Sequence, residues 1–230
     1  MRAADADVWS LPMDASSRLT QFRFQLGLAV GVTASVWACV LYLDRPFAQA
    51  FSRYLYGSQL QTLLSAVLSP FPYLVVIAVL CLALAGGFRA FGGVVPGWAR
   101  PPLLASLSLI CALISVLLLK SVFGRSALDP WYVQHGIYMF RWFDSGWAYD
   151  SFPSGTLTVA TALLYTLSRQ HPHLRALCML SLLVVLSGLL ATGSHWLSDA
   201  LAGIYLGFLM ATLASRLYPL VIGAAETSAV

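Results

Sequence analysis

The chain has 230 residues, of which 59% are hydrophobic and only 10% are charged, and its formal net charge is +4. A soluble domain usually carries about 25% charged residues, so the composition excludes an ordinary water-soluble domain and indicates a protein of the lipid bilayer. The basic residues form no run, which argues against a nucleic-acid partner. No cluster of side chains has the spacing of metal ligands, so we expect neither a metal nor another cofactor.

Six apolar runs follow one another along the chain. They are long and continuous and lack the period-two alternation of strands, so each is expected to form a membrane-spanning helix. The runs cover residues 24–43, 63–85, 103–119, 154–168, 176–191 and 197–214, and the second is interrupted by Pro70 and Pro72. The sequence therefore predicts an all-α fold, an integral membrane six-helix bundle.

Two connections between these runs are long. Residues 44–59 carry Phe47, Phe51 and Tyr54 at helical spacing, which predicts a short interfacial helix after the first span. Residues 121–153 are rich in aromatic side chains, a composition typical of the lipid headgroup region. The alternative is that this second segment forms a lid over a bound lipid.

The spans divide the chain into a polar N-terminal segment at residues 1–22, a membrane domain at 23–218 and a short tail at 219–230. The first segment is polar and acidic, unlike a secretory signal peptide. Six spans place both termini on one side, which would hold eight of the 13 Lys and Arg residues. By the positive-inside rule, the termini are expected in the cytoplasm and the opposite loops on the periplasmic or extracellular face of the inner or plasma membrane.

Three polar segments meet on that opposite face: "LKSVFGRS", "FPSGT" and "GSHWLSD". Ionisable groups at membrane depth are costly, so they are treated first as functional. Lys120 and Arg125 suit an anion, although a lysine that ends a span also serves as a headgroup anchor. Neither interpretation is decided by these two residues alone.

The segment "FPSGT" has the form of a phosphate-binding helix start. Ser154 is a candidate N-cap, Gly155 permits close approach of a ligand, and the first amides of a helix, around residues 154–156, favour an anion. The alternative is an ordinary capped helix after a proline.

His195 and Asp199 are spaced i, i+4, which on a helix places them on one face. Asp199 would then orient the imidazole and leave its other nitrogen as a nucleophile or base. The alternative is a structural polar pair between helices. Beyond them, Gly203 and Gly207 form a G-x-x-x-G face, which predicts close helix packing.

The three segments, in this order, resemble the type 2 phosphatidic acid phosphatase superfamily, whose motifs are K-x6-R-P, P-S-G-H and S-R-x5-H-x3-D. The resemblance implies six spans and a lipid phosphate or diphosphate substrate. It also implies that His195 is the nucleophile oriented by Asp199, and that a phosphohistidine forms and is hydrolysed. The phosphate-binding residues would be Lys120, Arg125, Ser154, Gly155 and Thr156.

Several family positions are altered. Ala127 and Leu128 stand at the R-P pair, Thr156 at the histidine that protonates the leaving group, and Gly188 and Leu189 at the S-R pair. Arg141 and His135 lie in the long loop and are candidate replacements for the lost cation and proton donor. The alternatives to a lipid phosphatase are a non-catalytic lipid-phosphate binding, transport or assembly protein, and a phosphoryl or headgroup transferase.

Overall fold

The computed structural model describes residues 15–54, 56–68, 71–91, 93, 95–128, 135–136, 140–144, 146 and 149–222. Most of the predicted N-terminal segment and tail lies outside these residues. The described part is helical apart from turns and two three-residue strands, so the all-α prediction is confirmed there. The strands, β1 (Phe123–Arg125) and β2 (Phe140–Trp142), form one antiparallel pair outside the apolar runs.

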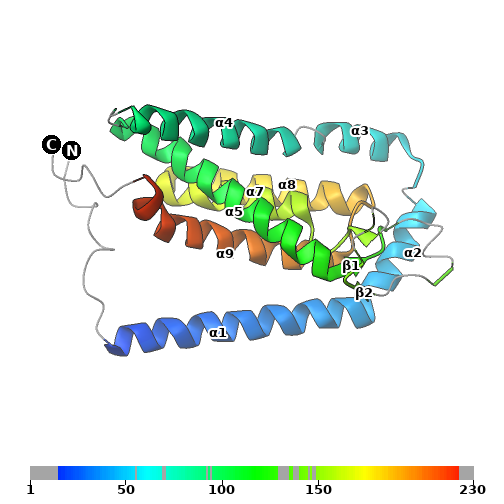
Figure 1. Cartoon of the computed structure of the whole chain (residues 1–230). Helices are drawn as coiled ribbons and strands as arrows, with labels where there is room; N and C mark the ends of the chain where they lie inside the picture. Colours follow the sequence, from blue (N-terminus) through cyan, green and yellow to red (C-terminus); the bar gives the residue numbers. More distant parts are fainter. Residues whose placement is uncertain are drawn as a thin grey trace.

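The helices follow the apolar runs closely (Figure 1). Their bounds are α1 (Ala15–Ala38), a π-helical turn (Cys39–Leu43), α2 (Asp44–Tyr54), α3 (Gln59–Leu68), α4 (Phe71–Ala90), α5 (Arg100–Val122), α7 (Gly155–Gln170), α8 (Arg175–Ala191) and α9 (Leu197–Ile222), with short 3-10 turns at Gly97–Ala99 and Pro172–Leu174. The second run is divided between α3 and α4, and α4 carries Pro72 in its first turn, where a missing amide proton costs least.

Within the part of the chain that the structure describes, four helical segments are long and apolar enough to cross a membrane. They are Phe22–Phe51, Gly97–Val122, Pro172–Ala191 and Leu197–Leu220, and Tyr73–Phe88 is a shorter apolar helix. These segments identify a membrane protein. The count of six spans and the orientation of the termini stay predictions.

Helix α7 occupies the middle of the bundle, between α5, α8 and α9 (Figure 1). It is 16 residues long and carries several threonines; the hydroxyls of Thr158 and Thr166 are hydrogen-bonded inside the protein, whereas the buried Thr161 hydroxyl has no hydrogen-bond partner among the described residues. Thr158 donates to the Ser154 carbonyl at 2.8 Å, and Thr166 shares a 2.8 Å hydrogen bond with Ser108 of α5. Burying a hydroxyl costs free energy unless it is paired, so these two bonds help a short, polar helix to lie in the core.

The G-x-x-x-G face of α9 packs directly against α7, as predicted. A Cβ atom at Gly203 would lie 2.7 Å from the Ser154 carbonyl oxygen, and one at Gly207 would overlap the Thr158 carbonyl oxygen. Both glycines therefore allow a backbone approach that any side chain would prevent.

A helix also forms where the short interfacial helix was predicted. Helix α2 continues α1 through the π-helical turn and buries Ala48 and Phe51 against Leu128 and Trp196. One face of α2 is therefore a protein contact, and its location at a membrane interface stays a prediction. The first turn of α1 and the last turn of α9 lie at one end of the bundle, whereas α2, β1 and β2 lie at the other (Figure 1).

Candidate functional site

The three polar segments of the sequence converge at the α2 end of the bundle. Arg125 in β1 pairs with Asp150 in an isolated parallel bridge, and the Ser151 amide donates to the Arg125 carbonyl at 3.1 Å. The Ser154 amide donates to the Asp199 carbonyl at 3.1 Å. These backbone bonds hold the end of α5, the start of α7 and the start of α9 against one another.

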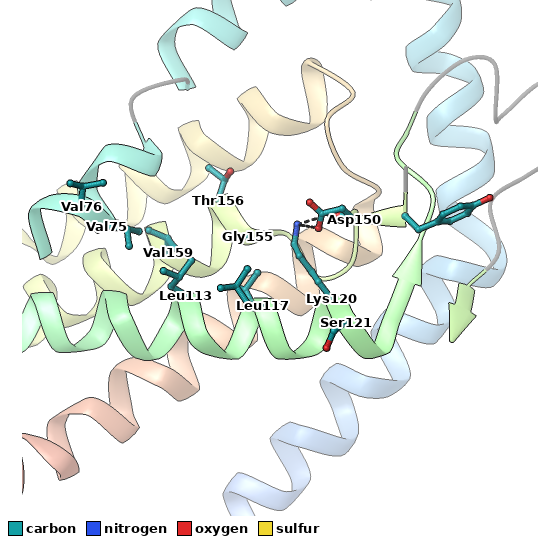
Figure 2. Close-up of a pocket in the computed structure, with 12 residues that line it drawn as sticks. Val75, Val76, Leu113, Leu117, Lys120, Ser121, Asp150, Gly155, Thr156 and Val159 are labelled. Atoms are coloured by element: carbon teal, nitrogen blue, oxygen red, sulfur yellow. Dashed lines mark hydrogen bonds and ion pairs between the residues drawn. The ribbon is translucent and has the colours of Figure 1, made fainter. Parts of the chain in front are cut away.

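A cavity of about 620 Å³ opens beside this junction, and three predicted phosphate-binding residues line it (Figure 2). These three are Lys120, Gly155 and Thr156. The remaining lining residues are Val75, Val76, Leu113, Val116, Leu117, Ser121, Tyr149, Asp150 and Val159. The cavity is therefore polar where α5 meets the start of α7, and apolar where α4, α5 and α7 face one another.

The start of α7 has the predicted capped form. Ser154 is fully buried with an extended backbone, and its hydroxyl accepts from the Leu157 amide at 3.5 Å. Gly155 and Thr156, the first two helical residues, line the cavity. Amides in the first turn lack partners within the helix and favour an anion, so the helix start suits a phosphate.

Lys120 is the cation of the cavity, and it is already paired. Its Nζ lies 2.5 Å from Oδ1 of Asp150 and donates to the Asp150 backbone carbonyl at 2.6 Å. The side chain of Lys120 is 19% exposed and that of Asp150 is 55% exposed. Figure 2 shows Lys120 extending from α5 to Asp150.

Arg125 is placed differently from the prediction. It is 1% exposed and does not line the cavity. Its Nη1 lies 2.5 Å from Oδ1 of Asp199, and its Nη2 lies 2.7 Å from Oδ2 of Asp44. Its guanidinium also stacks 4.9 Å from the Trp196 ring centroid. A guanidinium held by two carboxylates has the placement of a scaffold for the site, and its role in binding phosphate stays a prediction.

Asp44, at the start of α2, was not singled out in the sequence. Its Oδ2 accepts from Ser198 Oγ at 2.5 Å in addition to Arg125, and its Oδ1 accepts from the Ser198 amide at 3.1 Å. The carboxylate is 2% exposed. The available signal was its position as an acidic residue at the end of an apolar run, where an ionisable group needs a partner.

His195 and Asp199 do not share a helix face, because α9 begins at Leu197 and His195 precedes it. Oδ2 of Asp199 accepts from Ser151 Oγ at 2.5 Å and from the Trp196 amide at 3.3 Å. The His195 Nδ1 atom lies 3.1 Å from the Ser151 carbonyl oxygen. The predicted direct contact is therefore corrected: Asp199 and His195 are linked through Ser151, which contacts both.

The contact with Ser151 indicates the tautomer of the neutral His195 ring. A carbonyl oxygen only accepts hydrogen bonds, so Nδ1 carries the proton and Nε2 keeps its lone pair. Burial lowers the pKa of His195 from its usual value, and the Lys120 charge acts in the same direction, whereas the charges of Asp199 and Asp150 and the Ser151 carbonyl raise it. The neutral imidazole, which is the nucleophilic form, is therefore favoured.

Two of the altered family positions, Leu189 and Leu128, are packed as apolar core. Leu189 lies in a cluster with Leu157, Val185 and Ala200 of neighbouring helices, and Leu128 packs on Trp196. The candidate replacements do not fill the gap. Neither Arg141 nor His135 is among the described residues that line the cavity, and both are exposed. Arg141 pairs with Asp144 at 3.7 Å and stacks 4.6 Å from the Tyr149 ring centroid.

The fold and this site define a helical membrane protein with a cavity that suits an anion and with a histidine, His195, that is not among the described residues lining the cavity but is affected by the charges of Lys120 and Asp150, which do line it. The model of the PAP2 superfamily matches residues 101–222, which is more than half of the chain. The chain belongs to the PAP2 superfamily, whose members are phosphatases that act on phosphate esters. No match is found among curated proteins or among solved structures.

Proposed function

We propose that the protein is a membrane lipid phosphatase that removes phosphate from a lipid phosphate or a polyprenyl diphosphate through a phosphohistidine. The observation that carries this proposal is the two-sided cavity: Lys120 and the start of α7 at one part, and side chains such as Val75, Leu113 and Val159 at another. This arrangement matches an amphiphile whose anionic head and apolar chain enter one cavity.

In the first step, Nε2 of His195 attacks phosphorus and the bond from phosphorus to the leaving oxygen breaks. Lys120 and the amides at the start of α7 stabilise the charge on the phosphoryl oxygens. Ser151 keeps the imidazole in the required tautomer, and Asp199 holds Ser151. Arg125 contributes by fixing Asp199 rather than by touching the substrate.

The nature of the leaving group decides how fast this step is. A lipid alkoxide needs a proton, whereas a phosphate leaves without one because its second pKa is about 6. Thr156 stands where a proton donor is expected, and a general acid typically contributes a factor of about 10² to 10⁴. We therefore infer that a polyprenyl diphosphate such as undecaprenyl diphosphate is hydrolysed faster than a phosphatidic acid.

The test compares phosphate release from these two lipids by the wild type, by His195→Ala and by His173→Ala. His173 is an exposed histidine in the turn before α8 and serves as the matched control. The proposal predicts faster release from the diphosphate, loss of activity in His195→Ala only, and unchanged activity in the control. Faster release from the monoester would contradict the leaving-group argument. Phosphate release by His195→Ala at the wild-type rate would contradict the role of His195 as nucleophile.

A second candidate function is a non-catalytic lipid-phosphate binding protein. It is favoured by the apolar packing of Leu189 and by the carboxylate of Asp150, which pairs with Lys120 and competes with a substrate phosphate. Titration of lipid phosphate into wild type and Lys120→Gln distinguishes the two. Binding that depends on Lys120, without any turnover on the lipid panel, supports the binding protein.

A further inference from the structure

Asp150 has a backbone held by hydrogen bonds and a carboxylate that is largely exposed. The bridge to Arg125 and the hydrogen bond from the Ser151 amide hold its peptide against β1. Its carboxylate, 55% exposed, lines the same cavity as Lys120, Gly155 and Thr156. The first step of the proposed reaction makes no use of this group.

The second step of that reaction needs a base. Water must lose a proton as it attacks the phosphohistidine, and His195 is then itself part of the intermediate. Lys120 has no lone pair while it is an ammonium ion, and the hydroxyls of Thr156 and Tyr149 are weak proton acceptors. Among the described residues that line the cavity, the carboxylate of Asp150 is the group suited to accept the proton.

We propose that Asp150 is the general base that activates water for hydrolysis of the phosphohistidine; the inference rests on the proposed function. A proton of water passes to a carboxylate oxygen of Asp150, and the water oxygen forms a bond to phosphorus. The bond from phosphorus to Nε2 breaks, and its electron pair returns to the imidazole. Inorganic phosphate leaves, and the exposed carboxyl group releases its proton to solvent.

The ion pair with Lys120 is compatible with this role. Partly exposed ion pairs contribute little, so a phosphate can share Lys120 and free the carboxylate to meet a water molecule. In its ionised form Asp150 accepts a proton but cannot donate one. It therefore assists the second step and leaves the first step without a general acid, which agrees with a preference for a diphosphate.

Removing the charge of Asp150 has opposite effects on two quantities. Asp150→Asn removes a carboxylate that competes for Lys120, so KM is expected to fall or stay the same. Loss of the base is expected to lower kcat by a factor of about 10² to 10⁴. Because only the second step is slowed, the phosphohistidine is expected to accumulate.

The experiment uses the full chain in lipid nanodiscs and a polyprenyl diphosphate with a radiolabelled terminal phosphate. Wild type, Asp150→Asn, Asp150→Glu and Asp144→Asn are compared by steady-state kinetics and by rapid quenching. Asp144 is an aspartate of the same loop that lies outside the cavity lining and serves as the matched control. In Asp150→Asn, the label on His195 is expected to approach one phosphate per chain. Asp150→Glu is expected to recover part of the wild-type kcat, and Asp144→Asn is expected to behave as the wild type.

Two results would overturn the inference while the proposed function stands. In the first, Asp150→Asn hydrolyses the diphosphate at the wild-type rate. In the second, Asp150→Asn is slower than the wild type but does not accumulate the phosphohistidine. A wild type that releases no phosphate and never labels overturns the proposed function, and this inference with it. Accumulation of label in Asp150→Asn also shows that the variant is folded, because the first step requires an assembled site.

Discussion

Replacing Arg125 by methionine tests whether this arginine is a scaffold or a phosphate ligand. Arg125 is 1% exposed and is the partner of Asp44 and Asp199, which are 2% and 0% exposed. Arg125→Met leaves both carboxylates buried without their cation, and breaking a buried ion pair in this way costs about 3–5 kcal/mol. Asp44→Asn keeps one acceptor oxygen and leaves Arg125 paired with Asp199, so we expect a smaller cost of about 1–3 kcal/mol.

Combining Arg125→Met and Asp44→Asn in one chain gives a further prediction about stability. In the Arg125→Met background, Asp44→Asn removes an uncompensated charge, so the double variant is expected to be more stable than Arg125→Met alone. Contacting residues commonly show coupling energies of about 0.5–3 kcal/mol. The free energy of unfolding is measured by denaturation in mixed micelles, with Arg141→Met as the exposed control. The scaffold role is refuted if Arg125→Met costs no more than Arg141→Met, or if the double variant is the less stable one.

Two further predictions concern helix packing and pH. Gly207→Ala is expected to lower the free energy of unfolding by about 1–3 kcal/mol, because the added Cβ overlaps the α7 backbone at Thr158. The control Gly31→Ala in α1, where an added Cβ meets nothing within 4 Å, is expected to be neutral or stabilising. Equal unfolding midpoints of the two variants in micelles would contradict the packing argument. The lowered pKa of His195 keeps its imidazole neutral below the usual pKa of about 6.5, so activity is expected to persist below that pH and to fall only as pH drops through the lowered value. A pH profile of kcat/KM with its acidic limb above 6.5 would contradict this cause.

The helices were predictable because a continuous hydrophobic run favours a helix, and a proline interrupts one, within a short stretch of sequence. The run at 197–214 became the N-terminal part of α9, and the break near Pro70 and Pro72 separates α3 from α4. Close helix packing at Gly207 was predictable for the same reason, since a small-residue spacing marks one helix face, whereas the identity of its partner, α7, was not.

The hydrogen-bond network of the site was not predictable, because it depends on contacts between segments that are distant in the sequence. Asp44 and Ser198 are 154 positions apart, and no local pattern marks their hydrogen bond. The spacing of His195 and Asp199 indicated a direct contact only if both lay in one helix, and the start of α9 at Leu197 removed that condition. The same motif residues are present, but Ser151 joins them.

The central claim is that His195 carries the phosphoryl group during turnover. The most direct measurement is rapid quenching of wild type with labelled polyprenyl diphosphate, followed by mapping of the labelled residue by mass spectrometry. The account predicts a phosphohistidine at position 195 that forms and decays at rates compatible with turnover and is absent in His195→Ala. Turnover in the wild type without label on His195, or label on another residue, would contradict it.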